Sequence, residues 1–307
     1  MIICVTGPTA VGKTALSIAL AHKYDAIIIN CDAMQVYKGL DIGTAKVTEE
    51  EKENVPHYLL DFVPVYTNYT VFDYQKDARK VMEENKERNI IFVGGTGLYL
   101  KSALYDYRFS EENTKAKKDY SKYTNEELLK ICLKKDKNCN IHVNNRQRLE
   151  RFLDKEEVEV VPCKPLYKFY TIGLTTARDT LYTKINNRVD KMISDGLVSE
   201  AKYYYDRKIF SKALLTGIGY KELYQYFEGK ISLEDAILLI KKNSRHYAKR
   251  QYTWFNHQMD VKWFNVNFDD FDKTNKLIEE LGYYHRNYQD NKRIFYKYGD
   301  IEISIDS

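Results

Sequence analysis

The segment GPTAVGKT at residues 7–14 lies between an apolar run typical of a buried strand and a pattern typical of a helix. It matches G-x-x-x-x-G-K-[ST], the sequence of a loop whose backbone N–H groups surround phosphate oxygens at the start of a helix. Lys13 supplies a mobile cation, and the hydroxyl of Thr14 can ligate Mg²⁺. We therefore expect a di- or triphosphate to be bound by Gly7, Pro8, Thr9, Ala10, Val11, Gly12, Lys13 and Thr14.

Short apolar runs alternate with helical patterns, which predicts βαβ units. The apolar runs are rich in β-branched residues and lack polar alternation, as strands buried on both faces do. The expected fold class is α/β, a P-loop NTPase-like parallel sheet core with helices on both faces and a mostly helical insertion domain. Strands are predicted at residues 2–5, 26–30, 90–93 and 170–174, and helices at 12–23, 71–88, 180–194, 197–206, 219–227, 233–243 and 244–255.

The insertion is expected at residues 109–168, where strand signal is weak until 158–161. Leu128, Leu129, Cys132 and Leu133 follow a helical period, and Pro162 and Pro165 end the segment. Further on, Ser232 with Asp235 three residues later resembles a helix N-cap. The predicted domains are a core at 1–108 and 169–285, the helical insertion at 109–168, and a strand pair or loose tail at 286–307.

The composition excludes a disordered chain, a membrane-spanning protein and a disulfide-framework protein. Of the 307 residues, 44% are apolar and 30% charged, and no apolar run is long enough to span a bilayer. Five cysteines without a CxxC pair fit neither a disulfide framework nor a zinc site. A net charge of +4 is too weak by itself to indicate nucleic acid, but residues 241–258 carry basic and aromatic residues and no carboxylate. We expect a cytoplasmic, monomeric protein.

Asp32 follows the second predicted strand, where the carboxyl ends of parallel strands line a ligand crevice. An acid in this position is either a turn or cap residue or a catalytic group. The segment GGTGLY at 94–99 follows the third predicted strand, so Thr96 is expected in the same crevice. Gly94 stands where a magnesium-binding acid ends this strand in hydrolytic P-loop enzymes, which disfavours an ATPase.

Seven segments, in order, resemble the tRNA dimethylallyltransferase (isopentenyl-tRNA transferase) family of bacteria. The resemblance runs from residue 2 to about 270. The segments are GPTAVGKT, INCDAMQVYKGLDIGTAK, VPHYLLDF, IIFVGGTGLYL, LYTKINNRVDKMISDGL, TGIGYKEL and HYAKRQYTWF.

The resemblance implies transfer of a dimethylallyl group from dimethylallyl diphosphate to N6 of adenosine-37, the adenosine 3′ of the tRNA anticodon. It implies that the P-loop holds the donor diphosphate with Mg²⁺, and that Asp32 is the general base. Thr96 would help to hold the adenine, and Arg178 would clamp the diphosphate.

The resemblance also implies contact with the tRNA anticodon stem-loop. The matching positions are Asp32, Ala33, Met34, Gln35, Thr96, Gln147, Arg148, Leu149, Glu150, Arg151, Thr216, Gly217, Ile218, Gly219, Tyr220, Lys221, Lys249, Arg250, Gln251, Tyr252, Thr253, Trp254, Phe255 and Asn256.

Some positions depart from the family pattern. Ala33 replaces a serine, and Val143 and Asn145 replace a proline and an aspartate. Three other functions stay open at this point: an isopentenyltransferase that acts on free adenylate, a small-molecule P-loop kinase, and a non-catalytic RNA-binding module. The helical insertion and the basic segment at 241–258 disfavour the isopentenyltransferase that acts on free adenylate. The segment GGTGLY has no role in a kinase, which disfavours that function.

Overall fold

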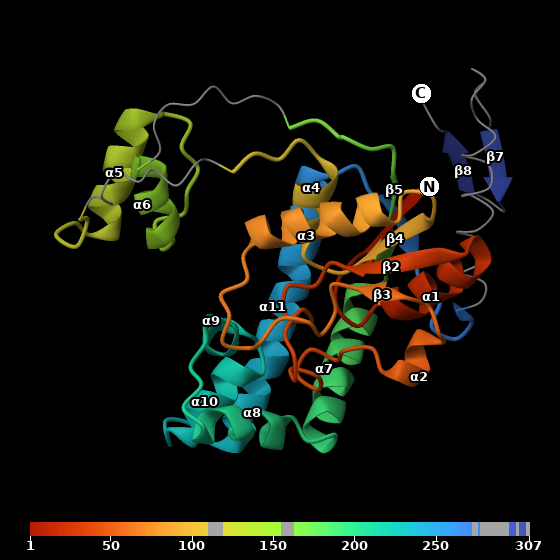
Figure 1. The fold of residues 1–307 in the computed structure, drawn as a ribbon. Helices are drawn as coiled ribbons and strands as arrows, with labels where there is room; N and C mark the ends of the chain where they lie inside the picture. Colours follow the sequence, from red (N-terminus) through yellow and green to blue (C-terminus); the bar gives the residue numbers. More distant parts are fainter. Residues whose placement is uncertain (110–118, 155–162, 272–275, 277–294, 299–300, 305–307) are drawn as a thin grey trace. The chain divides into compact units, whose positions relative to one another are not determined.

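The computed structural model describes residues 1–109, 119–154, 163–271, 276, 295–298 and 301–304 (Figure 1). The chain divides into two compact units. The larger unit comprises Met1–Tyr105 with Pro165–Ser307, and the smaller unit is Asp106–Lys164. The smaller unit covers most of the segment that we expected as an insertion.

The larger unit is built on a six-stranded sheet of order β3-β2-β4-β1-β5-β6, in which every neighbouring pair is parallel. Ile27, Ile28 and Ile29 of β2 are fully buried, as expected for a strand covered on both faces. The predicted α/β fold class with a parallel sheet is confirmed. The strands are β1 (Ile2–Thr6), β2 (Ala26–Asn30), β3 (His57–Tyr58), β4 (Asn89–Val93), β5 (Tyr170–Thr175) and β6 (Lys262–Asn265).

Helices cover both faces of this sheet, and the strand order explains why. The β1–α1–β2 and β2–α3–β4 crossovers run in opposite directions across the sheet. Because both crossovers are expected to be right-handed, α1 and α3 must lie on opposite faces (Figure 1). The helices are α1 (Lys13–Tyr24), α2 (Glu49–Lys52), α3 (Val71–Glu84), α4 (Gly97–Leu104), α7 (Arg178–Ser194), α8 (Leu197–Asp206), α9 (Lys212–Thr216), α10 (Tyr220–Phe227) and α11 (Leu233–Gln258).

Some elements differ from the sequence prediction. Residues 233–243 and 244–255 form one continuous helix, α11, because neither glycine nor proline interrupts them. Helix α3 ends at Glu84 and not at residue 88. Strands β3 and β6 were not predicted, since two and four residues are too short to show a period. The predicted cap is confirmed: the Ser232 hydroxyl accepts a hydrogen bond from the backbone N–H of Asp235 at 3.1 Å.

The C-terminal segment contains one antiparallel pair, formed by β7 (Phe295–Tyr298) and β8 (Ile301–Ser304). This pair lies in the segment for which a strand pair or a loose tail was expected. The strand predicted at residues 158–161, and Pro162 after it, lie outside the described residues.

The smaller unit packs α5 (Asn125–Lys135) against α6 (Arg146–Asp154). Leu128, Cys132 and Leu149 are fully buried between the two helices. Leu133, which shares the helical period, remains 39% exposed. The helical character expected for this segment is therefore present, and among its described residues a small apolar core holds the two helices together.

Candidate active site

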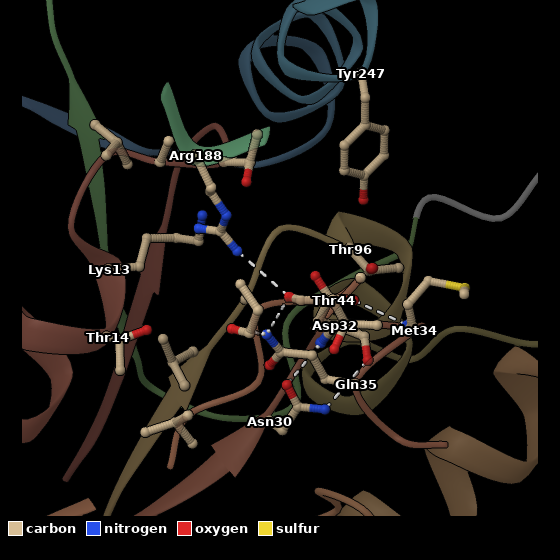
Figure 2. A pocket seen from close by; sticks show the side chains of 18 of the residues that line it. Lys13, Thr14, Asn30, Asp32, Met34, Gln35, Thr44, Thr96, Arg188 and Tyr247 are labelled. Atoms are coloured by element: carbon tan, nitrogen blue, oxygen red, sulfur yellow. Dashed lines mark hydrogen bonds between the residues drawn. The ribbon is translucent and has the colours of Figure 1, made fainter. Parts of the chain in front are cut away.

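A cavity of about 840 Å³ opens at the carboxyl ends of β1, β2 and β4 (Figure 2). Segments that lie far apart in the sequence line it: the P-loop, the residues after β2, the loop after β4, and side chains of α7 and α11. Convergence at this edge follows from the parallel sheet, because every strand in it ends on the same side.

The P-loop joins β1 to α1 and makes a sharp turn at Gly7. Gly7 has φ +131°, and a Cβ at this position would lie 2.4 Å from the carbonyl oxygen of Leu174. Helix α1 begins after Gly12, whose backbone is left-handed and supplies no capping side chain. The first N–H groups of a helix have no partner within it, and Lys13 and Thr14 at this end of α1 line the cavity, as suits an anion site.

Lys13 is half-buried, and its ammonium group donates a hydrogen bond to the carbonyl of Pro8 at 2.7 Å. The pKa of Lys13 is lowered to about 7, first by burial and then by the positive charge of Arg188, while the Asp32 carboxylate acts in the opposite direction. Lys13, Arg188 and Asp32 therefore act on one another within one cavity. A bound anion would restore the charge of Lys13.

Arg188 comes from the middle of α7 and points into this cavity (Figure 2). Its Nη2 donates to the carbonyl oxygen of Thr44 at 3.3 Å. The sequence analysis missed Arg188, although a signal exists. Leu181, Ile185 and Val189 form the buried face of α7, and an arginine beside that face is either paired or functional.

Arg178, which the resemblance assigns to the diphosphate, lies outside the cavity lining. Arg178 is exposed at the start of α7, and its guanidinium lies over the ring of Tyr182 at 5.1 Å. Ten residues further along α7, Arg188 does line the cavity.

Asp32 follows β2 and lines the cavity, as expected (Figure 2). The Asn30 side chain brackets it, since Oδ1 accepts from the N–H of Asp32 at 3.1 Å and Nδ2 donates to its carbonyl at 3.2 Å. One carboxylate oxygen of Asp32 accepts from the N–H of Met34 at 2.9 Å. Asp32 is thus a turn residue that also lines the cavity, and its catalytic role stays a prediction.

Thr96 lies at the start of α4, and its hydroxyl accepts from the backbone N–H of Ala33 at 3.0 Å. This bond joins the loop after β4 to the segment that carries Asp32. Tyr247 of α11 also lines the cavity beside Thr96 (Figure 2). The sequence analysis did not single out Tyr247, because aromatic residues on a basic helix gave no reason to separate it from its neighbours.

Gln251 of α11 connects two loops of the site. Its Oε1 accepts from the N–H of Thr9 at 3.1 Å, and its Nε2 donates to the carbonyl of Gly95 at 3.1 Å. At Gly97 a Cβ would lie 2.0 Å from the ring of Trp254, so α11 approaches the backbone of this loop closely. The P-loop and the loop after β4 therefore share one buried amide.

The residues expected to contact RNA differ in their exposure to solvent and fall into buried, half-buried and exposed groups. The buried members, which are not accessible to RNA, are Leu149, Gly217, Gly219, Tyr220, Gln251 and Phe255. The exposed members are Gln147, Arg148, Arg151, Thr216, Lys249, Arg250, Thr253 and Asn256. The half-buried members are Asp32, Ala33, Met34, Gln35, Thr96, Glu150, Ile218, Lys221, Tyr252 and Trp254.

Comparisons with known proteins agree on one family. Residues 35–258 match the family model of IPP transferase. A tRNA dimethylallyltransferase of Enterococcus faecalis is 44% identical over 284 residues, which are 86% of this chain and 91% of that protein. The chain belongs to the IPP transferase family. The resemblance found in the sequence is confirmed, and membership in this family of transferases excludes the kinase and the non-catalytic module.

Solved structures of the family have the same fold. The full-length tRNA isopentenylpyrophosphate transferase of Bacillus halodurans is 38% identical with a TM-score of 0.70, and the match covers 93% of this chain and 98% of that one. A eukaryotic dimethylallyltransferase acting on tRNA is 25% identical with a TM-score of 0.76, covering 93% of this chain and 79% of that one.

In the part of the chain that the structure describes, no helix has the length and apolar character needed to cross a membrane. The same residues contain no group of three or more His, Cys, Asp or Glu side chains placed to hold a metal ion.

The pKa of Lys13 predicts that anion binding takes up a proton. The pKa of Lys13 in the free protein is about 7. At pH 8 the free amine is mostly neutral, and inorganic diphosphate favours the charged form, so about one proton should be bound with the ligand. Diphosphate affinity should therefore weaken as the pH rises above 7. Calorimetry at pH 8 in two buffers of different ionisation enthalpy measures this uptake.

Lys13→Arg is the control for this experiment, because arginine stays protonated in both states. The variant should bind diphosphate without the proton uptake of the native chain. Equal uptake by both proteins would assign the proton to another group.

Proposed function

We propose that this chain transfers the dimethylallyl group of dimethylallyl diphosphate to N6 of adenosine-37, beside the tRNA anticodon. The products are N6-(dimethylallyl)adenosine and diphosphate. One observation carries this proposal: a single cavity holds a phosphate-binding loop with two cations, Lys13 and Arg188, and a carboxylate, Asp32, on a separate segment. The names of the relatives, tRNA dimethylallyltransferases, support the donor and the acceptor.

Asp32 acts as the general base. The N6 lone pair of adenine is delocalised into the ring, so the amine attacks poorly unless a carboxylate accepts its proton. In the transfer, a bond forms between N6 and the allylic carbon, and the bond from that carbon to the diphosphate oxygen breaks. The N6 proton passes to the carboxylate oxygen of Asp32. The bond from Met34 N–H to one oxygen of Asp32 fixes the carboxylate for this task.

The P-loop, Lys13 and Arg188 stabilise the departing diphosphate. The allylic carbon carries partial positive charge as the bond breaks, so negative charge accumulates on the leaving oxygen. Donors that are already in place stabilise this charge without reorganising. The low pKa of Lys13 in the free protein fits this role, because its amine gains its charge as the anion arrives.

The residues present fit Mg²⁺. Thr14 and Asp32 both line the cavity and offer the oxygen ligands that this ion prefers. The Thr14 hydroxyl would hold it, and the ion would supply further charge neutralisation on the diphosphate. A site with few protein carboxylates is typical where substrate phosphates and water complete the coordination.

The adenine must leave its stack to reach Asp32. This movement is base flipping, in which the base turns out of the stack into a pocket of the enzyme. Thr96 and the segment from Asp32 to Gln35 would hold the flipped base. The exposed Lys249 and Arg250 of α11 would contact tRNA phosphates, and Gln147, Arg148 and Arg151 of the smaller unit would contact the anticodon stem-loop. The monomeric state stays a prediction.

Removal of the base should abolish turnover without loss of donor binding. Asp32→Asn keeps the size of the side chain but cannot accept a proton at neutral pH, so turnover should fall about 10²–10⁴-fold. Transfer of labelled dimethylallyl to an unmodified anticodon stem-loop measures turnover, with AMP as the alternative acceptor. Asp179→Asn, on the exposed first turn of α7, is the matched control. A parallel loss of melting temperature and of diphosphate binding in Asp32→Asn would contradict the role.

Variants of two arginines of α7 test which side chain stabilises the diphosphate: Arg178, expected from the sequence, or Arg188, which lines the cavity. Arg188→Ala should lower turnover about 10²–10³-fold, because it removes a cation from the leaving group. Arg178→Ala should leave turnover close to that of the native chain, since Arg178 is exposed and outside the cavity lining. The reverse ranking in the same transfer assay would restore the assignment made from the sequence.

The basic surface of α11 should account for part of the salt dependence of tRNA binding. The double variant Lys249→Gln/Arg250→Gln should bind tRNA more weakly, with the slope of log affinity against log salt reduced by about one for each lost phosphate contact. Lys80→Gln/Lys86→Gln makes the same change of charge at side chains 71% and 65% exposed. Equal slopes in the two double variants would remove α11 from the interface.

A further inference from the structure

One carboxylate holds three consecutive backbone N–H groups of the loop between β2 and α2. Oε2 of Glu200 accepts from the N–H groups of Asp41 and Ile42 at 3.0 and 2.8 Å, and Oε1 accepts from that of Gly43 at 3.0 Å. Oε1 also accepts from the hydroxyl of Tyr220 at 2.6 Å. Glu200 belongs to α8 and Tyr220 to α10, so two helices fix this loop at one point.

Four donors directed at one side chain require an ionised carboxylate. A carboxylate offers about four acceptor positions on two oxygens, whereas a glutamine offers one oxygen and would turn N–H donors toward the loop. Tyr220 is fully buried, and burial together with the charge of Glu200 raises the pKa of Tyr220, so its hydroxyl remains a donor. The arrangement therefore depends on the chemical identity of both side chains.

The fixed loop continues directly into the cavity. Gly43, Thr44 and Ala45 line it. The Thr44 carbonyl accepts both from Nη2 of Arg188 at 3.3 Å and from Nε2 of Gln35 at 3.1 Å (Figure 2). This carbonyl orients the guanidinium that faces Lys13, and it is one residue beyond the last N–H that Glu200 holds.

Bonds within the loop make it a stiff unit. The N–H of Ala45 donates to the carbonyl of Ile42 at 3.0 Å, and that of Lys46 donates to the carbonyl of Asp41 at 2.9 Å. The Thr44 hydroxyl donates to the carbonyl of Leu40 at 2.6 Å. A displacement of residues 41–43 would therefore carry the Thr44 carbonyl with it.

We propose that Glu200, with Tyr220, is a positioning residue for Arg188. It acts through the Thr44 carbonyl and contacts neither substrate. Its carboxylate holds residues 41–43 in the place from which Thr44 directs the guanidinium toward the donor diphosphate. This proposal rests on the proposed function, since it assigns a target to the guanidinium.

Glu200→Gln and Tyr220→Phe test the proposal in the full chain. Glu200→Gln should reduce kcat and the affinity for inorganic diphosphate with Mg²⁺, because an error of about 1 Å in a reacting group costs on the order of 10²-fold in rate. The KM for the anticodon stem-loop should stay near the native value. Tyr220→Phe removes one donor of four, so it should change the same two quantities in the same direction by less.

The decisive measurement combines each variant with Arg188→Ala. If Glu200 acts through Arg188, Glu200→Gln should add little to the loss of diphosphate affinity in the Arg188→Ala background. Effects that multiply in the double variant would overturn the proposal, as would native diphosphate affinity in both single variants. Diphosphate binding does not require prenyl transfer, so this test fails or succeeds independently of the proposed function.

Asp73→Asn is the control for a loss of stability alone. Asp73 accepts from the N–H of Thr70 at 2.8 Å and caps α3, and it does not line the cavity. Its substitution should lower the melting temperature and leave diphosphate affinity unchanged. If Glu200→Gln does not fold, Tyr220→Phe with its Arg188→Ala double variant gives the same decision, and additive effects there overturn the proposal.

Discussion

The burial of two cationic side chains, Lys13 and Arg188, in one cavity is the constraint on which the site depends. Lys13 and Arg188 both line one cavity, and the carboxylates near them, Asp32 and, for Arg188, Glu51, offset only part of the cost of their burial. The fold sustains this arrangement with backbone oxygens, since the carbonyls of Pro8 and Thr44 accept from Lys13 and Arg188. The free protein is therefore preorganised for an anion. A bound anion would neutralise the positive charge of Lys13 and Arg188 that the protein's own carboxylates leave uncompensated.

Much of the site could be predicted because its chemistry is local in sequence. The P-loop requires glycine, lysine and threonine at fixed spacings, and the ends of two buried strands placed Asp32 and Thr96 beside it. Arg188 could not be found in this way. It reaches the cavity from the middle of α7, and only the packing of that helix decides whether Arg178 or Arg188 faces inward.

Features set by tertiary packing and not by local sequence also account for the differences between the predicted and the observed fold. The central strands were predicted from their continuous apolar runs, whereas β3 and β6 are set by the neighbours that they pair with and not by their own pattern. Tyr220 and Phe255 belong to segments that resemble RNA-contacting ones, yet the structure buries both side chains. A family motif identifies a region, and burial decides which of its side chains can touch a ligand.

Helix α11 has 26 residues and is unbroken, so at about 1.5 Å per residue it is a rod roughly 39 Å long. Near its end the ring of Trp254 lies against the backbone of Gly97, with no space for even one added carbon. A methyl group at that glycine would tilt the rod, and the tilt would be magnified toward Leu233 at the opposite end. Side chains larger than that of glycine are therefore excluded at residue 97 by a local contact with Trp254, although the consequence of a substitution would reach the far end of α11.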